Sequence, residues 1–570
     1  MSKFQKMNKK CHGLALLLVF LCQLSFVSAG DQPNVIVVLV DDMGYSDLGS
    51  FGGEVDTPHI DALAKNGIRF TQNYNSARCC PSRASLLTGL YSHQTGLADF
   101  TGRDQTKAKG PAYLGHLNQE CVTMATVLKT AGYNTYGVGK WHVGKGEAAS
   151  PENRGFDEYY GYTDFHGKNQ WAFNSKGSRG YQRLPEGRKE ELSYTRETFY
   201  ATDVFTDYAM EFIDQGVKKK KPFFLYLAHS SPHFPLQAPA KTRDKYLERY
   251  RQGWDILREK RFERQKKIGL ATDSWTLPAL SLVPKDPKGK MGPIDNGYGG
   301  KPNPPWDSLD ADTREDLTYR MALFAAMIDH VDQGVGKIVA QLKALGQFEN
   351  TLILFTSDNG ACYEWGPLGF DGGSRMGEYI LHKGKDLKKM GLPGCKEMSV
   401  GSAWACMSNT PLRLYKHFNH EGGNCSPMIA HWPKGIKNPD RWVRTPIHLM
   451  DYMPTICEAS GAKYPEVYEG RQITPVEGKS LVPIFEGDDL LKRTIYFDHF
   501  KSSAIRKGPW KLVRARFDPR GVWQLYNIEE DRCETNDLAK TNVEMVKSME
   551  SQWTDWALKV KLFPFYRPEN

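Results

Sequence analysis

Short apolar, β-branched runs that each end abruptly at polar residues constrain the fold of this chain more than any other feature. They occupy residues 35–40, 136–138, 223–227 and 352–355. Continuous apolar runs of this length are typical of strands that are buried on both faces, as in a parallel sheet. The sequence therefore predicts a large sheet whose polar residues are concentrated where the strands end.

Helical patterns lie between these runs. One covers Thr123 to Ala131 and stops at a glycine, and another covers Tyr319 to Leu345 with apolar residues at helical spacing. Strands that alternate with helices predict a doubly wound α/β domain with a mixed or parallel sheet, flanked by helices. Ligands of such domains bind beyond the carboxyl ends of the strands, so the polar residues should meet at one edge of the sheet.

The middle and the end of the chain do not show this alternation of apolar strands and helices. Residues 240–267 are highly charged with helical composition, which predicts solvated helices, and a Pro/Gly-rich, irregular segment follows through Pro305. Short strand-like pieces at 494–497, 510–513 and 523–526 precede a helical tail that begins near Asn542. These pieces predict a smaller C-terminal α+β unit, with an antiparallel sheet and a helix packed on the main domain.

The N-terminus has the pattern of a cleavable secretory signal. Four lysines precede an uncharged apolar stretch from Leu14 to Val27, and the small residues that follow predict cleavage after Ala29. A retained membrane anchor is the alternative, but the run is short for a spanning helix and no second run of that length follows. We therefore expect a signal peptide at 1–29, a catalytic domain at 30–490, a C-terminal subdomain at 491–570, and a secreted or periplasmic protein without a stable membrane anchor.

Net charge and cysteine content narrow the possible ligands and partners only slightly. Loss of the signal removes four lysines and lowers the formal net charge from +9 to +5, a weak excess that is compatible with anionic substrates. No nucleic-acid partner is expected. Nine of the 11 cysteines remain, and export makes disulfides possible. No Cys/His cluster has zinc spacing, so a structural zinc site is not expected.

The most specific motif runs from Cys79 to Gly89. Its order, Cys-x-Pro-Ser-Arg followed by Leu-Leu-Thr-Gly, resembles the signature of the formylglycine-dependent sulfatases, which are arylsulfatase-like members of the alkaline-phosphatase superfamily. The resemblance extends from Asn34 through Asn536. It implies that Cys79 is oxidised to formylglycine by a maturation enzyme, while Cys80 fills the variable position. Pro81 suits a first helical turn, so this side chain should lie near a helix N-terminus, which favours an anion such as a sulfate ester.

Oxygen donors follow two of the predicted strands. Asp41 and Asp42 follow one strand, and Asp358 and Asn359 follow another. Single pairs of this kind are usually turn or cap residues. Hard oxygen donors without His or Cys suit Ca²⁺, and Mg²⁺ fits less well because it prefers to retain water in a strict octahedron. Both pairs match the metal ligands of the sulfatases in order, and the resemblance adds the formylglycine oxygen from Cys79.

The same resemblance implies roles for the remaining site residues. Lys140 and Lys416 would bind sulfate, His142 would assist release of sulfate, and His233 would contact the substrate and protonate the departing alcohol. Arg83 would orient the formylglycine hydrate, and Asp358 would help to activate its attacking hydroxyl. One hydroxyl would attack sulfur and the other would expel sulfate. His229 and His330 have no such match and are expected to be structural.

The sequence thus predicts a sulfuric ester hydrolase that acts on a sulfated small molecule or glycan, with a sulfated carbohydrate favoured. A phosphonate or phosphodiester hydrolase can share the fold and the formylglycine. A zinc phosphatase would need further His/Asp ligands around a Ser or Thr nucleophile, and Cys79 stands in that place. A noncatalytic glycan-binding relative would have lost the nucleophile or the metal ligands, whereas every expected residue is present.

Overall fold

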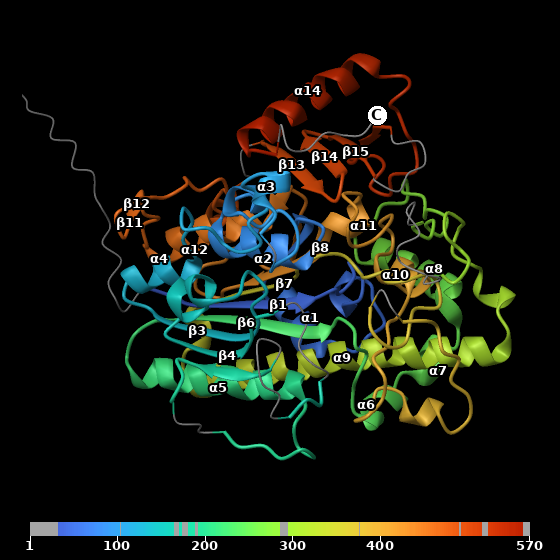
Figure 1. Ribbon diagram of the computed structural model, residues 1–570, viewed down its shortest axis with the longest axis horizontal. Coiled ribbons are helices and arrows are strands. Elements are labelled where there is room, and N and C mark those ends of the chain that lie inside the picture. The colour runs from blue at the N-terminus through green and yellow to red at the C-terminus, as the bar shows by residue number, and fades with distance from the viewer. Residues whose placement is uncertain are drawn as a thin grey trace, which may run out of the picture.

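The structure is a computed structural model that describes residues 32–102, 104–164, 170–173, 180–188, 192–285, 295–374, 377–488, 492–515 and 522–562. The expected signal peptide lies outside these residues. The main body is an α/β domain around one large mixed sheet, and a small antiparallel sheet with one helix lies against it (Figure 1). Both parts agree with the predicted fold class. Among the described residues, no helix is long and apolar enough to cross a membrane.

The large sheet is mixed: its central strands are parallel to one another, and antiparallel pairs occur on both sides of them. Its strand order is β10-β2-β8-β7-β1-β6-β3-β4-β5, with β9 paired to β2. The strands are β1 (Asn34–Asp41), β2 (Ile68–Tyr74), β3 (Asn134–Lys140), β4 (Glu158–Tyr162), β5 (Gln182–Leu184), β6 (Phe223–Pro232), β7 (Thr351–Ser357), β8 (Cys425–His431), β9 (Arg441–Val443) and β10 (Ile447–His448). The four apolar runs of the sequence are β1, β3, β6 and β7. They are neighbours in the order β7-β1-β6-β3, so their carboxyl ends lie side by side.

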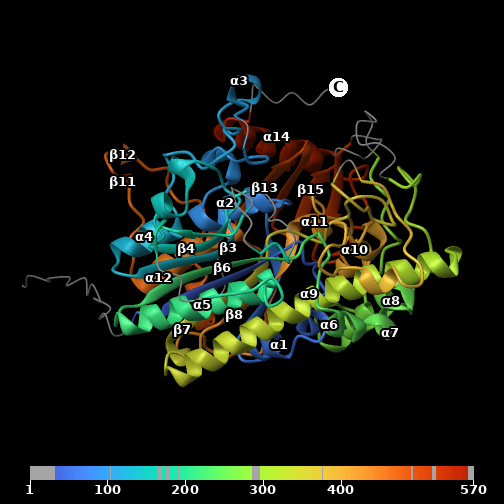
Figure 2. The same cartoon turned by 60° about the horizontal axis from the view of Figure 1, so that its bottom comes forward.

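Helices cover both faces of this sheet. One face packs on α1 (Pro58–Lys65), α5 (Ala201–Lys218) and α9 (Ala311–Ala344), and the last two run alongside each other (Figure 2). The other face packs on α2 (Cys79–Thr88), α4 (Met124–Thr130) and α12 (Tyr452–Ser460). β1 contributes alternate side chains to the two cores, because successive residues of a strand point to opposite faces.

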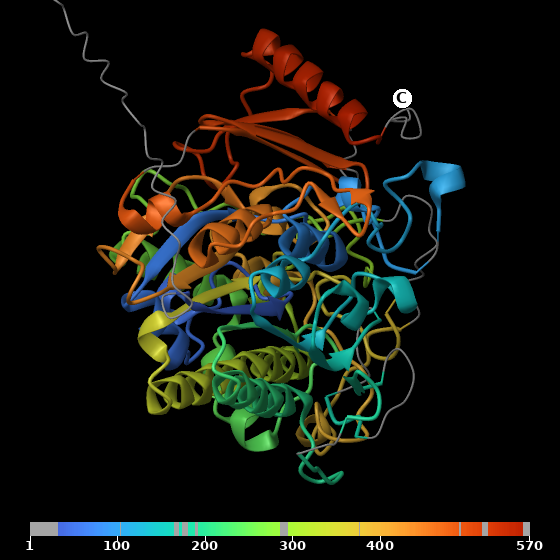
Figure 3. The same cartoon turned by 90° about the vertical axis from the view of Figure 1, so that its left-hand side faces the viewer.

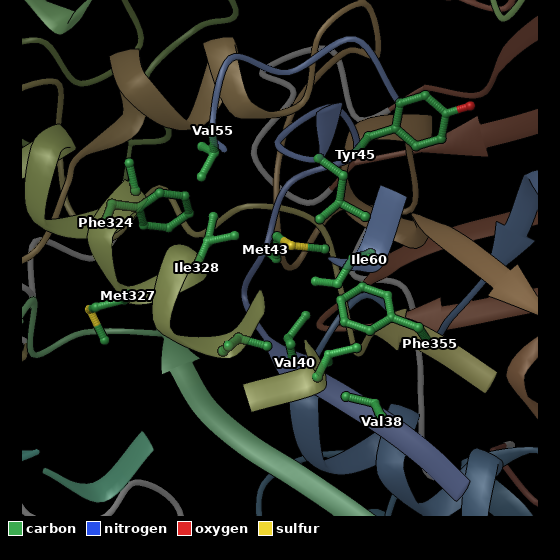
Figure 4. Close-up of a cluster of buried hydrophobic side chains, with 14 of the residues drawn as sticks. Val38, Val40, Met43, Tyr45, Val55, Ile60, Phe324, Met327, Ile328 and Phe355 are labelled. Carbon is green, nitrogen blue, oxygen red and sulfur yellow. The ribbon is translucent and has the colours of Figure 1, made fainter. Parts of the chain in front are cut away.

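The core beneath α9 shows this arrangement in detail. Val38 and Val40 of β1 and Phe355 of β7 meet Phe324 and Ile328 of α9 (Figure 4). All five side chains are buried, at 2% exposure or less. Burial of apolar side chains on both faces fixes the register of the central strands and therefore the positions of their polar ends.

The long helix begins earlier than the periodicity predicts. The apolar pattern places its start at Tyr319, whereas α9 begins at Ala311. Asp310 supplies the N-cap, because its side chain accepts a hydrogen bond from the backbone N–H of Thr313. Most residues of the added turns are polar, including the buried Thr313, Asp316 and Thr318, which is why hydrophobic spacing alone misses them.

The charged stretch forms helices, but its charges are not all solvated. It contains α6 (Ala240–Asp244), α7 (Leu247–Tyr250) and α8 (Gly253–Lys267). Arg261 of α8 is fully buried, and its Nη1 and Nη2 atoms lie 2.8 Å from Asp47 Oδ1 and 2.6 Å from Glu54 Oε1. The expectation of a solvated face is wrong at this residue, because its partners come from a segment about 200 residues away.

The C-terminal unit has one more strand than the sequence pattern indicates. Its sheet contains β13 (Thr494–His499), β14 (Ser502–Lys507), β15 (Trp510–Arg514) and β16 (Gln524–Asn527) in antiparallel order. The helical tail is α14 (Val543–Lys559), which lies over this sheet (Figure 3). β14 was missed because several of its residues are polar or charged although all but the last are buried. The division of the chain at residue 490 stays a prediction.

Candidate active site

The four central strands bring the predicted site residues to one edge of the sheet. Asp41 is the last residue of β1 and Lys140 is the last residue of β3. Asp358 directly follows β7, and His233 directly follows β6. The tertiary structure adds Cys79 from the start of α2 and Lys416 from the segment that precedes α11 (Glu421–Asn424).

The acidic and amide side chains form one buried group. Asp41 and Asp358 have 0% exposure, Asp42 has 1% and Asn359 has 0%. Asn359 Nδ2 donates to Asp42 Oδ1 at 2.6 Å, and the backbone N–H of Asp42 donates to Asp358 Oδ1 at 3.3 Å. Asp42 has a φ of +66°, a left-handed conformation that turns the chain sharply after β1. Two strand ends therefore direct four oxygen-bearing side chains to one point.

Three cationic side chains surround this acidic group. Lys140 Nζ lies 2.5 Å from Asp41 Oδ2, and Lys416 Nζ lies 2.8 Å from Asp42 Oδ1. Arg83 Nη2 lies 2.8 Å from Asp358 Oδ2, and Arg83 Nη1 donates to the carbonyl of Lys140 at 2.9 Å. All three cations are nearly or fully buried. The site therefore holds paired charges that burial alone would disfavour.

The pKa shifts follow from this crowding. Burial acts to raise the pKa of Asp41, but Lys140, His233 and Arg83 together hold it well below its usual value. Burial and the neighbouring Asp41 carboxylate raise the pKa of Asp358 well above its usual value. Burial opposes ionisation of the Cys79 thiol, yet the adjoining Cys80 and Lys140 lower its pKa. Ionisation of all the carboxyl groups at once is therefore unfavourable unless further positive charge lies among them.

The donor set fits a hard divalent cation. Asp41 Oδ1 and Asn359 Oδ1 are buried and have no hydrogen-bond partner among the described residues. Unpaired buried oxygens are costly, and a cation that accepts both would satisfy them. Three carboxylates and an amide are the ligands that Ca²⁺ prefers in proteins. His233 Nε2 also lies close, 3.4 Å from Asp42 Oδ2.

Cys79 lies at the N-terminus of α2. The helix covers Cys79–Thr88, with Pro81 in its first turn as predicted, and the αL residue Gly89 stands at its C-terminus. The start of a helix presents unpaired backbone N–H groups and the positive end of the helix dipole. Arg83 is one turn farther along the same helix, so a single element positions both the sulfur and the guanidinium.

Two histidines follow the neighbouring strands β3 and β6. His142 follows β3 with a φ of +55°, is 1% exposed, and its ring packs edge-on against Phe100 at a centroid distance of 5.3 Å. Its nearest ring nitrogen lies within 4.8 Å of the sulfur atoms of Cys79 and Cys80. Burial lowers the pKa of His142 to about 4, which keeps it neutral. His233 Nδ1 lies 2.6 Å from the carbonyl of Phe234, and this contact fixes the ring so that Nε2 faces Asp42.

All ten predicted site residues thus meet in one place, although their chemical roles stay predictions. The two histidines that were expected to be structural lie outside this group. His330 contacts Asp203 and Thr242, and His229 is buried beside Phe205. All nine cysteines among the described residues are free thiols.

Comparison with known proteins agrees with this arrangement. The family model described as Sulfatase matches residues 33–462, and a second, described as N-sulphoglucosamine sulphohydrolase, C-terminal, matches residues 413–558. The chain therefore belongs to the Sulfatase family. It is 32% identical over 540 residues to an uncharacterized sulfatase of Schizosaccharomyces pombe, covering 92% of this chain and 93% of that relative. It is 30% identical over 495 residues to an arylsulfatase of Klebsiella aerogenes, covering 84% and 97%.

Among solved structures, the chain resembles Ps i-CgsB in complex with k-i-k-neocarrahexaose. The TM-score is 0.62 at 26% identity, covering 92% of this chain and 93% of that chain. Together these relatives define the protein as an arylsulfatase-like hydrolase.

Several residues beside the site were not predicted from the sequence. Arg78, Asp99, Glu364, His417 and His499 all lie around Cys79 and Lys416. Arg78 and His417 adjoin predicted site residues in the sequence, and that adjacency was the one signal available. Asp99 and Glu364 come from loops and His499 from the end of β13, and their approach depends on the tertiary structure.

Proposed function

We propose that this sulfatase removes sulfate from a sulfated carbohydrate, with formylglycine made from Cys79 as the nucleophile. The observation that carries the proposal is the placement of Cys79 at the start of α2, among Lys140, Lys416 and the acidic group. A sulfate ester is a tetrahedral anion, and two buried ammonium groups with a helix N-terminus form a complementary environment. When formed, the aldehyde hydrate supplies one hydroxyl that attacks sulfur and a second whose deprotonation releases sulfate.

Calcium is the metal that the donors favour. Asp41, Asp42, Asp358 and Asn359 would hold it, together with the modified side chain of Cys79. When bound, the ion supplies Lewis-acid stabilisation of charge on the sulfate oxygens. Lys140 and Lys416, each already within 3 Å of a proposed metal ligand, would share the same oxygens. Arg83 would keep the hydrate and Asp358 in fixed orientation.

Proton transfers are assigned to three side chains. Asp358 would accept the proton of the attacking hydroxyl, since it belongs to the buried acidic group and is oriented by Arg83. His233 would donate a proton through Nε2 to the departing alcohol oxygen. His142 is neutral and buried beside Cys79, so it would take the proton of the second hydroxyl when sulfate leaves.

A carbohydrate is favoured as the alcohol part of the substrate. The solved relative at 26% identity carries a neocarrahexaose in its complex. A relative at 24% identity, over 94% of this chain, is an N-acetylglucosamine-6-O-sulfatase of Bacteroides thetaiotaomicron. The N-terminal pattern supports a secreted or periplasmic location, where such polymers are encountered.

The test is a substrate comparison with purified, metal-loaded protein in which the conversion of Cys79 has been measured. Nitrophenyl sulfate, the matched phosphate and a phosphonate monoester are assayed side by side, followed by a panel of defined sulfated sugars. We expect kcat/KM to be highest on sulfate esters and at least one sulfated sugar to be hydrolysed. A preference for the phosphonate would replace the proposal with the phosphonate hydrolase alternative, and activity on aryl sulfates alone would remove the carbohydrate assignment.

A further inference from the structure

Five polar side chains form a group beside the nucleophile that the proposed reaction does not use. They come from five segments of the chain: Arg78, Asp99, Glu364, His417 and His499. We call these residues the outer group. Their exposures are 6%, 9%, 9%, 5% and 1%. Buried polar side chains in such number require mutual partners or a ligand.

Three of them form a hydrogen-bonded chain. Glu364 Oε1 lies 3.2 Å from His417 Nε2, and His417 Nδ1 lies 3.2 Å from His499 Nε2. Glu364 Oε2 accepts from Ser374 Oγ at 3.1 Å. A carboxylate offers about four acceptor positions, so Glu364 keeps acceptor capacity beyond these two contacts.

The other two form an ion pair beside aromatic rings. Arg78 Nη1 lies 2.9 Å from Asp99 Oδ1. The Arg78 guanidinium lies over the rings of Phe100 and Phe500, at 4.5 and 4.7 Å from their centroids. Both rings are partly exposed. Binding sites combine apolar or aromatic surface with a few polar groups that orient the ligand, and the two rings with the ion pair offer both.

The outer group adjoins the reacting residues directly. Arg78 precedes Cys79, and His417 follows Lys416. The backbone N–H of His417 donates to the carbonyl of Ala77 at 2.7 Å, and Cys80 Sγ donates to the carbonyl of Asp99 at 3.3 Å. Phe100 packs against His142. A substrate whose sulfur is at Cys79 therefore extends its next atoms into this neighbourhood.

Exposure increases from the acidic group to the carboxylates and aromatic rings of the surrounding residues. The acidic group and Lys140 have 0 to 1% exposure, Asp99 and Glu364 have 9%, and Phe100 and Phe500 are partly exposed. A substrate enters from the exposed side with its sulfate innermost. The alcohol that leaves must then lie among the outer residues.

We infer that the outer group is the subsite for the sugar that carries the sulfate ester, with Glu364 and Asp99 accepting hydrogen bonds from hydroxyls next to the ester. This inference rests on the proposed sulfatase reaction and narrows its substrate class to sugars with free neighbouring hydroxyls. Glu364 and Asp99 are therefore specificity-determining residues. The hydrogen bonds that link Glu364 through His417 to His499 hold the Glu364 side chain in place.

The test compares Glu364→Gln and Asp99→Asn with the native enzyme on one sulfated sugar and on nitrophenyl sulfate, which lacks hydroxyls. Glu458→Gln, an exposed glutamate of α12, is the matched control. A hydrogen bond from a hydroxyl to a charged acceptor predicts that kcat/KM on the sugar falls by about 10-fold or more. The fall on nitrophenyl sulfate should be much smaller, and the control should change neither value.

The outcomes separate this inference from the proposed function. Equal losses on both substrates would overturn the subsite and make the two acids structural. Unchanged sugar hydrolysis in both variants would overturn it as well. The proposed function fails on a different result, namely absence of sulfate ester hydrolysis by the native enzyme. A sulfated sugar without neighbouring hydroxyls gives an independent check, since its kcat/KM should be insensitive to Glu364→Gln.

Discussion

Lys511 Nζ lies 2.5 Å from Glu421 Oε1, and neither side chain is exposed to solvent. Lys511 belongs to β15 of the C-terminal sheet, whereas Glu421 begins α11 in the main domain. Arg532 also contacts Glu421, and the backbone N–H of Glu421 donates to Glu534 Oε2 at 3.0 Å. Segment 413–421, which carries Lys416, is therefore held by buried charges of the C-terminal unit.

Replacement of Lys511 should destabilise the protein strongly. Lys511→Met leaves the carboxylates of Glu421 and Glu534 buried with less compensating charge, which costs about 3 to 5 kcal/mol of unfolding free energy. Urea denaturation measures it. Lys559→Met is the control, because Lys559 pairs with Glu477 at 2.8 Å but is 63% exposed, so it should cost less than about 1 kcal/mol. Similar losses of unfolding free energy in the two variants would show that the buried Lys511 contributes no more than an exposed ion pair does.

Oxidation of cysteine to formylglycine should be confined to Cys79. Trypsin cleaves after Arg78 and Arg83, so residues 79–83 form one peptide that contains both adjacent cysteines. Fragmentation of that peptide from active protein should place an aldehyde at Cys79 and an intact thiol at Cys80, because only the first position matches the motif. Activity in protein whose Cys79 remains fully a thiol would refute the assigned nucleophile.

Removal of metal should lower both activity and thermal stability. Without a cation the carboxylates of Asp41, Asp42 and Asp358 repel one another, and a ligand that binds only the folded state raises the unfolding temperature. Thermal unfolding before and after chelation, followed by addition of calcium or zinc, measures the effect. Calcium should restore the unfolding temperature better than zinc. An unfolding temperature that chelation leaves unchanged would exclude the site.

Substitution of His233 should affect substrates according to their leaving group. Sugar alkoxides need a proton in the transition state, whereas nitrophenolate departs without one. His233→Ala should therefore slow a sugar sulfate by about 10²- to 10⁴-fold and nitrophenyl sulfate much less. His142→Ala should slow release of sulfate for both substrates, since that step no longer contains the alcohol. Single-turnover release of alcohol separates the steps, and equal losses in His233→Ala would remove the general-acid role.

Asp498 should make stability depend on pH. Its side chain is buried on β13 and accepts from Ser503 Oγ at 2.9 Å. Burial raises its pKa from 3.8 to about 7, so the folded state holds the proton more tightly than the unfolded state does. This contribution favours folding below about pH 4 and is lost as pH rises to about 7.

Asp498→Asn should remove that loss. Relative to the native chain, the variant should gain unfolding free energy between about pH 4 and 7, by up to about 4 kcal/mol. Urea unfolding of both proteins at about pH 5 and about pH 8 checks the sign. A difference that does not vary with pH would show that Asp498 titrates normally.

Much of the fold could be predicted because buried strands and helices have characteristic local patterns of apolar residues. The runs at 35–40 and 352–355 are apolar in every position because β1 and β7 are covered on both faces. β14 and the first turns of α9 escaped prediction because several of their buried residues are polar or charged. Arg261 was misjudged because its partners Asp47 and Glu54 are remote in the sequence.

The sequence by itself determined that a large sheet forms and that polar residues stand at the ends of four of its strands. That prediction rests on local periodicity, whereas the site residues were predicted from separated motifs that resemble those of the sulfatases, of which residues 79–89 form the most specific. Only the tertiary structure decided which side chains surround those residues. Glu364, His417 and His499 meet because a loop after β7, the segment before α11 and the end of β13 pack together. Contacts of that kind depend on how separate elements dock, and no local pattern of residues records them.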